Sequence, residues 1–412
     1  MTGLSALGYT KGDDAASDGG APAVRSSAMS FSSQAFVDGA IAATGLDDFG
    51  DGAWRDGLDA LCASLTAEAE LNRVGVAVQR ASISQLLEQR LQIVDWHRRF
   101  PEIGAEEVRR PAIVVGLPRT GTTALAHLLA ADADSRSLRT WEASSPTPPP
   151  EKATEHTDPR IAATQAGMEM MHEMTPDLAR MYFATATSPS ETLQLTGMSF
   201  RSFQDTGQAH VPSYEDFFMS CDMNDAYVFE RKVHQLLQWR CGPTRWAWKN
   251  PPDLFALDAV RAAFPDAIFI WTHRDPFPAM RSLCSLLTVV RSFRTDHRDY
   301  VSLGPRQTQL WAEATERAMR VRDEIGDDAF VDVWMDDLVR DPMATMGALY
   351  DQLGWPLTDH AERAMRDWSA GNPQHGRGGH DPSAADFGLD AAAVRERFAP
   401  YRRRFGREDS NG

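Results

Sequence analysis

Apolar residues recur at helical spacing through the first part of the chain. From Ser33 to about Phe100, leucine, alanine and valine return at steps of three and four, and no strand-like alternation interrupts them. We therefore predict a helical N-terminal segment over residues 33–108. The preceding residues, 1–32, are rich in Gly, Ala, Ser and Asp, a composition typical of a flexible tail.

Four short runs further along have the β-branched or aromatic character of buried strands. They are Pro111–Gly116, Arg245–Asn250, Ala267–Arg274 and Ala329–Met335. Each run is followed by a stretch with helical periodicity. Strands that alternate with helices predict a parallel sheet covered on both faces, and we assign residues 109–405 to this α/β domain.

Two further features divide the α/β domain. A proline-rich break after the first helix leads into residues 161–240, a helical insertion that we expect to shape the binding site of an acceptor. Near the end of the chain, Asp341 followed by Pro342 predicts the start of a capped helix. We expect the last residues, 406–412, to be a tail.

The composition excludes several classes of protein. Of the 412 residues, 42% are hydrophobic and 24% charged, and the net charge is −16. This charge argues against nucleic acid as a partner and against an anionic membrane surface. There is no secretory signal pattern and no apolar run near the ~18 residues of a transmembrane helix. We therefore expect a cytoplasmic protein, whose oligomeric state the sequence does not indicate.

The stretch GLPRTGTT joins the first predicted strand to the first predicted helix, the order that a phosphate loop requires. Compared with G-x-x-x-x-G-K-[ST], Gly116, Gly121 and Thr123 occupy their expected positions, but Thr122 replaces the lysine. Arg119 supplies a cation inside the loop instead. Backbone amides and the helix N-terminus can bind a phosphate here. The missing lysine argues against ATP or GTP hydrolysis.

A second motif follows the third predicted strand. Arg274 stands at the carboxyl end of that strand, and Ser282 lies eight residues on, about two turns into the next helix. Ligands of parallel sheets bind at this edge, so the pair can hold a second phosphate. A nucleotide with a 5′-phosphosulfate and a separate 3′-phosphate has this arrangement of charges. Sulfuryl transfer needs no metal where a cation such as Arg119 neutralises the leaving phosphate.

The two motifs together resemble those of the sulfotransferases that use 3′-phosphoadenosine-5′-phosphosulfate (PAPS). GLPRTGTT resembles the 5′-phosphosulfate loop of their bacterial and tyrosylprotein branches, and HRDPFPAMRS resembles their 3′-phosphate motif. RTWEASSPTPPP, WAWKNP and FAPYRRRF extend the likeness along most of the chain. The resemblance implies a P-loop fold like that of the nucleotide kinases. It also implies that PAPS is bound by Pro118, Arg119, Thr120, Gly121, Thr122, Thr123, Arg274 and Ser282.

The resemblance also suggests catalytic residues. Glu142 follows the loop helix at about the interval of the catalytic glutamate in the tyrosylprotein branch, and we predict that it is the base for the acceptor hydroxyl. Glu191 and His172 are the alternatives. Lys249, at the end of the second predicted strand, is expected to contact the sulfuryl oxygens together with Arg119.

Two other parts of the sequence match the family pattern less well. Asp253 stands where many relatives have histidine, which weakens any proposal for a base there. QHGRGGHDP resembles the glycine-rich loop that closes on the 3′-phosphate in cytosolic sulfotransferases, and Arg377 and Gly378 would supply a cation and a free amide.

The sequence thus predicts a metal-independent sulfotransferase that moves a sulfuryl group from PAPS to a hydroxyl of a small-molecule or lipid-like acceptor by in-line displacement. One alternative is a phosphotransferase of the nucleotide-kinase class, which would require Mg²⁺ and ATP. The other is a non-catalytic nucleotide-binding protein, which would bind the nucleotide without turnover. Nothing in the sequence identifies the acceptor.

Overall fold

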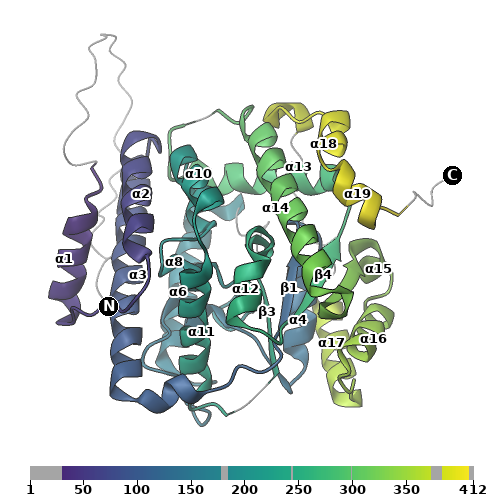
Figure 1. Cartoon of the computed structure of the whole chain (residues 1–412), viewed down its shortest axis with the longest axis horizontal. Helices are drawn as coiled ribbons and strands as arrows, with labels where there is room; N and C mark the ends of the chain where they lie inside the picture. The colour runs from purple at the N-terminus through teal and green to yellow at the C-terminus, as the bar shows by residue number, and fades with distance from the viewer. Residues whose placement is uncertain (1–29, 178–183, 243–244, 298, 373–382, 408–412) are drawn as a thin grey trace.

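A five-stranded parallel sheet forms the centre of the computed structural model, which describes residues 30–177, 184–242, 245–297, 299–372 and 383–407 (Figure 1). The strand order is β2-β3-β1-β4-β5. The four predicted strands are confirmed as β1 (Ala112–Gly116), β3 (Arg245–Lys249), β4 (Ile268–His273) and β5 (Phe330–Trp334). The sequence pattern missed β2 (Ser135–Arg136), because two residues are too few to form a pattern.

The central strand β1 determines where a ligand can bind. It pairs in parallel with β3 on one side, Ala112 opposite Ala247, and with β4 on the other, Gly116 opposite Thr272. The chain therefore crosses from one side of β1 to the other between β3 and β4. Such a change of direction leaves a crevice at the carboxyl ends of the strands.

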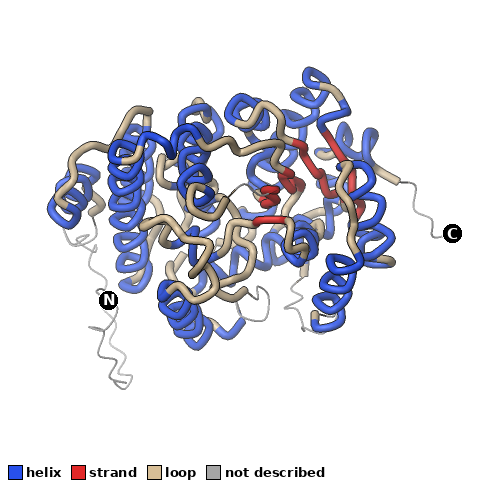
Figure 2. Tube along the Cα trace, turned by 90° about the horizontal axis from the view of Figure 1, so that it is seen from below, coloured by secondary structure: helices blue, strands red, loops and turns tan. Residues whose placement is uncertain are grey.

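Helices cover both faces of the sheet, as predicted, so that the strands lie in the interior of the molecule (Figure 2). One face packs against α4 (Thr122–Ala131), α16 (Pro342–Leu353) and α17 (Asp359–Gly371). The other face packs against α11 (Asn224–Gln238), α12 (Leu257–Ala263), α13 (Pro276–Ser292) and α14 (Leu303–Ile325). The sheet edge near β5 continues into α15 (Met335–Arg340), and the described chain ends with α18 (Ala391–Arg397) and α19 (Ala399–Phe405).

The periodic N-terminal stretch folds into α1 (Ser33–Thr44), α2 (Trp54–Ala67) and α3 (Arg73–Arg99), on the opposite side of the molecule from α15, α16 and α17 (Figure 1). Their apolar faces belong to the same hydrophobic core as α11 and the sheet. The described residues between 161 and 240 are largely helical. They include most of α6 (Pro159–Met174) together with α8 (Leu193–Gly197), α9 (Gln204–Gln208), α10 (Pro212–Ser220) and α11.

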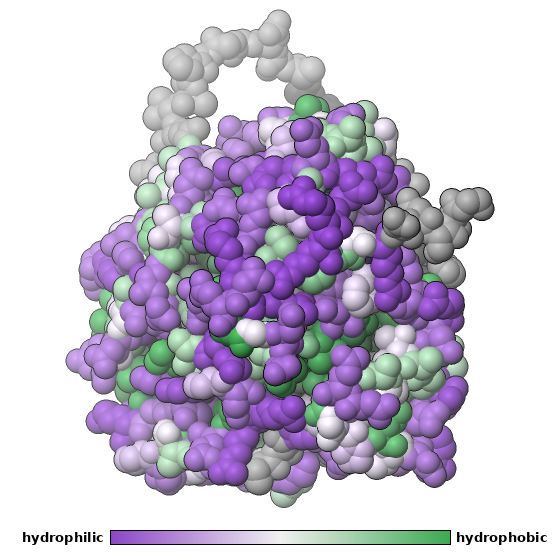
Figure 3. Space-filling view, turned by 45° about the vertical axis from the view of Figure 1, so that its right-hand side comes forward, coloured by the Kyte–Doolittle hydropathy of each residue, from purple (hydrophilic) through white to green (hydrophobic). Residues whose placement is uncertain are grey.

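The surface reflects the charged composition of the chain. In the face drawn in Figure 3, hydrophilic residues predominate and apolar residues form small, separate patches. Within the described ranges, no helix is long and apolar enough to cross a membrane.

Candidate functional site

The phosphate loop runs from the end of β1 into α4 and is fixed to the neighbouring strand. Gly116 has a φ of +144°, and a Cβ there would lie 2.3 Å from the Oγ1 atom of Thr272 and 2.6 Å from its carbonyl oxygen. Thr120 forms a hydrogen bond of 2.6 Å with the same Thr272 hydroxyl. Gly121, with a φ of +89°, then starts α4. The backbone of the loop is therefore held close to β4.

A Gly116→Ala variant is expected to lose about 3 kcal/mol or more of stability, because the added methyl group meets backbone of β4 and the residue is in a conformation that favours glycine. Urea denaturation measures this loss. Gly39→Ala is the matched control, since a Cβ at Gly39 has no atom within 4 Å. An equal effect of the two substitutions would contradict the tight contact.

The two phosphate motifs predicted from the sequence meet in the structure. The Nε atom of Arg119 donates a hydrogen bond to Oγ of Ser282 (3.0 Å), and Nη1 of Arg274 donates to the carbonyl oxygen of Arg119 (2.8 Å). Arg119 itself has a φ of +69°, the left-handed region that most side chains avoid. The loop thus bends so that its arginine lies between the two motifs.

These arginines form a positive cluster. Burial lowers the pKa of Arg119, and the charge of Arg274 lowers it further. Burial also lowers the pKa of Arg274. In the part of the chain that the structure describes, neither guanidinium forms a salt bridge with an acidic side chain. An anion bound between them would relieve both the repulsion and the cost of burial.

Lys249 reaches the same loop from β3. Its side chain is 1% exposed, and its Nζ atom donates to Oγ1 of Thr123 (3.1 Å) and forms a salt bridge with Oε1 of Glu191 (2.6 Å). The chain around Glu191 runs parallel to the end of β3. The Glu191 side chain is 27% exposed, so a carboxylate at the loop remains open to solvent. Among the other predicted loop residues, Thr122 is buried and Pro118 half-buried.

Glu142 has a different environment. It lies on α5 (Thr140–Ser144), is fully buried, and accepts hydrogen bonds from Arg136 (2.7 Å) and from the side chain and backbone of Arg139 (2.7 and 3.1 Å). Burial by itself raises the pKa of Glu142, but the charge of Arg136 and the bonds from Arg139 outweigh it, and the net shift is downward. The carboxylate is held as an ion by two cations.

The sequence also predicted roles for His172, Arg377 and Gly378. His172 is half-buried in the last turn of α6, and Arg377 and Gly378 lie outside the described residues. Sequence reasoning missed Thr272, which fixes the loop, and His273, which bonds to Asp332 and to the hydroxyl of Tyr401 (2.9 Å each) beside Arg274. No local pattern marks these residues, because their partners come from distant parts of the chain.

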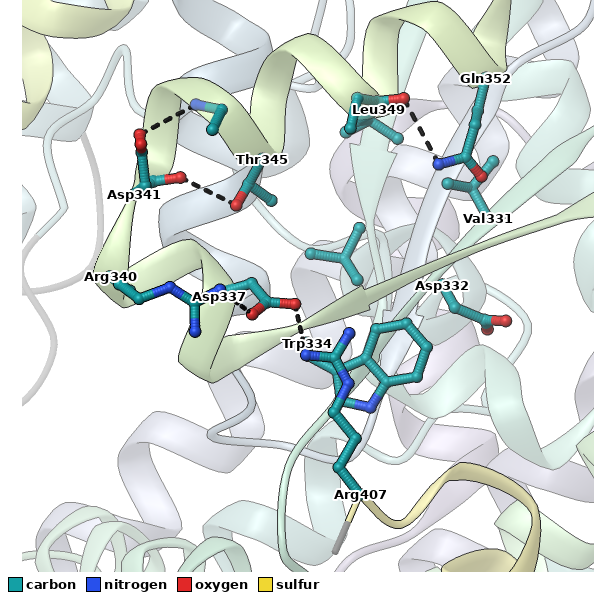
Figure 4. A pocket seen from close by; sticks show the side chains of 13 residues that line it. Val331, Asp332, Trp334, Asp337, Arg340, Asp341, Thr345, Leu349, Gln352 and Arg407 are labelled. Atoms are coloured by element: carbon teal, nitrogen blue, oxygen red, sulfur yellow. Dashed lines mark hydrogen bonds and ion pairs between the residues drawn. The ribbon is translucent and has the colours of Figure 1, made fainter. Parts of the chain in front are cut away.

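A separate surface hollow of about 350 Å³ lies over β5, α15 and α16 (Figure 4). Its charged side chains largely neutralise one another, since Asp337 forms salt bridges with Arg340 (2.5 Å) and Arg407 (2.6 Å). At the phosphate loop, by contrast, Arg119 and Arg274 form no salt bridge with any acidic side chain that the structure describes, although Lys249 is paired with Glu191. The loop therefore remains the favoured anion site.

Comparisons with sequence families and with solved structures both match this chain to sulfotransferases. The sequence model of the sulfotransferase family matches residues 111–359, which include β1, the loop and both motifs. Among solved structures, sulfotransferase STF9 from Mycobacterium avium superimposes with a TM-score of 0.85 at 29% identity, over 92% of this chain and 97% of that one. Sulfotransferase STF1 from Mycobacterium tuberculosis H37Rv does so with a TM-score of 0.79 at 32% identity, over 89% and 98%. A search of curated proteins found no match.

Proposed function

The chain belongs to the sulfotransferase family, and from that premise we propose that it transfers the sulfuryl group of PAPS to a hydroxyl of a small-molecule or lipid-like acceptor. The contact between the two motifs carries this proposal. Arg274 donates to the backbone of Arg119, and Arg119 donates to Ser282, so the cations predicted for the two phosphates lie in one site. A ligand with two separated anionic groups fits this arrangement better than a single phosphate does.

The residues at the loop fit PAPS. Because Gly116 lets the loop lie close to β4, the loop amides and the N-terminus of α4 would bind the 5′-phosphosulfate. Arg119 would supply the cation. Arg274 and Ser282 would hold the 3′-phosphate. When bound, PAPS supplies the sulfuryl group, whose sulfur bonds to the acceptor oxygen as its bond to the phosphate oxygen breaks. Lys249 and Arg119 would stabilise the negative charge that develops on these oxygens.

The contacts favour Glu191 over Glu142 as the base. A general base needs access to the acceptor hydroxyl, and Glu191 is partly exposed beside Lys249, whereas Glu142 is sealed between Arg136 and Arg139. We therefore assign to Glu191 the uptake of the acceptor proton, and to Glu142 the fixing of the segment that follows β2.

The helical parts of the chain would shape the acceptor pocket. Glu191 belongs to residues 161–240, the insertion between the first helix of the α/β domain and β3. This insertion and the N-terminal helices of residues 33–108 are therefore proposed to select the acceptor, while residues 109–405 provide the sheet and the nucleotide site. The N-terminal helices, the insertion and the sheet share one hydrophobic core, which would couple acceptor selection to nucleotide binding.

Thermal stability measured with nucleotides tests the nucleotide assignment. The product 3′-phosphoadenosine-5′-phosphate at 100 times its Kd is expected to stabilise the protein by about 2.7 kcal/mol, and ATP with Mg²⁺ is expected to have little effect. Arg274→Ala should remove most of this stabilisation. Arg366→Ala is the control, because Arg366 is exposed on α17 and pairs only with Glu362 among the described residues. An unchanged response in Arg274→Ala would refute the 3′-phosphate assignment.

A turnover assay distinguishes the proposed sulfotransferase from the kinase-like and the non-catalytic alternatives. Release of 3′-phosphoadenosine-5′-phosphate from PAPS, in the presence of a panel of phenolic and long-chain alcohols, should proceed equally with and without a metal chelator. Strict dependence on Mg²⁺ and ATP would favour the kinase-like alternative. Binding without turnover on any acceptor would favour the non-catalytic one.

A further inference from the structure

A buried group of polar side chains adjoins the Lys249–Glu191 pair and has no part in the function proposed above. It contains two carboxyl groups, two hydroxyl groups and one amide, each at most 2% exposed: Asp253, Glu230, Tyr227, Thr192 and Asn250. Asn250 follows Lys249 in the chain, and Thr192 follows Glu191. The buried group is therefore attached directly to the residues that contact the loop.

The carboxyl group of Asp253 is the centre of this group. It lies on η3 (Pro251–Phe255), just after β3, and its Oδ1 atom accepts hydrogen bonds from Nδ2 of Asn250 (2.6 Å) and from the hydroxyl of Tyr227 (2.8 Å). Glu230 lies three residues after Tyr227 on α11, so the two share a helix face. The second oxygens, Oδ2 of Asp253 and Oε2 of Glu230, are buried without a hydrogen-bond partner within the described residues.

The two carboxyl groups have no salt-bridge partner in the described part of the chain. Two ionised carboxylates this deeply buried would repel each other at high cost. Burial and the charge of Asp253 raise the pKa of Glu230 well above its usual range. Burial, followed by the charge of Glu191, raises the pKa of Asp253 to about 7 against the bonds from Tyr227 and Asn250.

The other elements around η3 do not change this balance. On α12, Asp258 adds only further negative charge near Tyr227. The strand β1 has no charged residue, and α14 packs on η3 through Trp311. Lys249 is the nearest cation along the chain, and its ammonium group is bound to Glu191 and Thr123. The pair of carboxyl groups thus holds at least one proton at neutral pH.

We propose that Asp253 and Glu230 form a proton-holding pair whose charge determines how readily Glu191 takes the acceptor proton. This inference rests on the proposed role of Glu191. Repulsion between ionised Asp253 and Glu191 is relieved when Glu191 becomes protonated, so proton uptake is favoured while Asp253 carries a charge. Glu230 retains its proton and limits the pair to a single charge. Both residues act through Glu191 and are therefore positioning residues.

The pH dependence of kcat/KM for PAPS turnover tests the pair. In the wild type, kcat/KM should fall toward acid pH with an ionisation near 7, the pKa of Asp253. Asp253→Asn should lack this ionisation and be about tenfold slower at pH 8. Glu230→Gln should retain the ionisation near pH 7, because Glu230 is already neutral and glutamine keeps it so. Three parallel profiles would overturn the proposal.

Thermal unfolding without nucleotide tests the pair independently of activity. The pKa of Asp253 is raised in the folded protein, so its contribution to stability is full below the unfolded pKa and is lost as pH rises through about 7. The Tm of Asp253→Asn relative to wild type should therefore increase between pH 5 and pH 8. A constant difference would refute the pair. A wild type without turnover at any pH would instead contradict the proposed function, and Asp253→Ser, which also removes the ionisable group, serves if Asp253→Asn does not fold.

Discussion

Replacing Arg119 with alanine is expected to lower kcat/KM for PAPS turnover by about 10²- to 10³-fold, the usual effect of removing one preorganised donor from a developing negative charge. Arg119 is half-buried and bonded to Ser282, so its guanidinium is oriented before the ligand arrives. Alanine removes both the charge and that contact. Release of 3′-phosphoadenosine-5′-phosphate measures the effect.

Two variants make this result interpretable. Arg119→Lys keeps the charge without the Nε bond to Ser282, and we expect an intermediate rate. Ser282→Ala removes the partner alone and should mainly weaken nucleotide binding. If Arg119→Ala retained more than about a third of wild-type activity, Arg119 would not stabilise the transition state.

The second large effect separates the two glutamates. Glu191→Gln is expected to lower kcat by about 10²-fold or more, because it removes the base, and to lower Tm less than Glu142→Gln does, because buried Lys249 loses one partly exposed ion-pair partner. Glu142→Gln is expected to destabilise the protein by about 3–5 kcal/mol, because it leaves buried Arg136 and Arg139 without their shared anion. Steady-state kinetics and denaturant unfolding of both variants measure these effects.

The opposite pattern would restore the prediction made from the sequence. If Glu142→Gln folded with wild-type stability and lost its activity, and Glu191→Gln remained active, Glu142 would be the base. The measurement also separates chemistry from folding, because the activity of Glu142→Gln is read at a temperature where the variant is still folded.

Local patterns predicted much of the fold. The β-branched run at β1 and the apolar run at β4 indicate strands by themselves, since each strand is buried on both faces. Asp341 caps α16 as its position before Pro342 predicted, accepting a hydrogen bond from the amide of Ala344 (3.0 Å). The helical stretch expected directly after the second predicted strand is interrupted. Residues 251–255 form η3, which places Asp253 beside Tyr227, and α12 begins only at Leu257.

What the sequence by itself determined about this protein is the loop, the second motif and their order, because the conformation of a strand, turn and helix depends on neighbouring residues. Only the tertiary structure decided which side chains meet. Arg119 and Ser282 are 163 positions apart, and their contact depends on the register of β1 against β4. Packing likewise sealed Glu142 between two arginines and left Glu191 at Lys249, since burial and ion pairing arise only when distant segments come together.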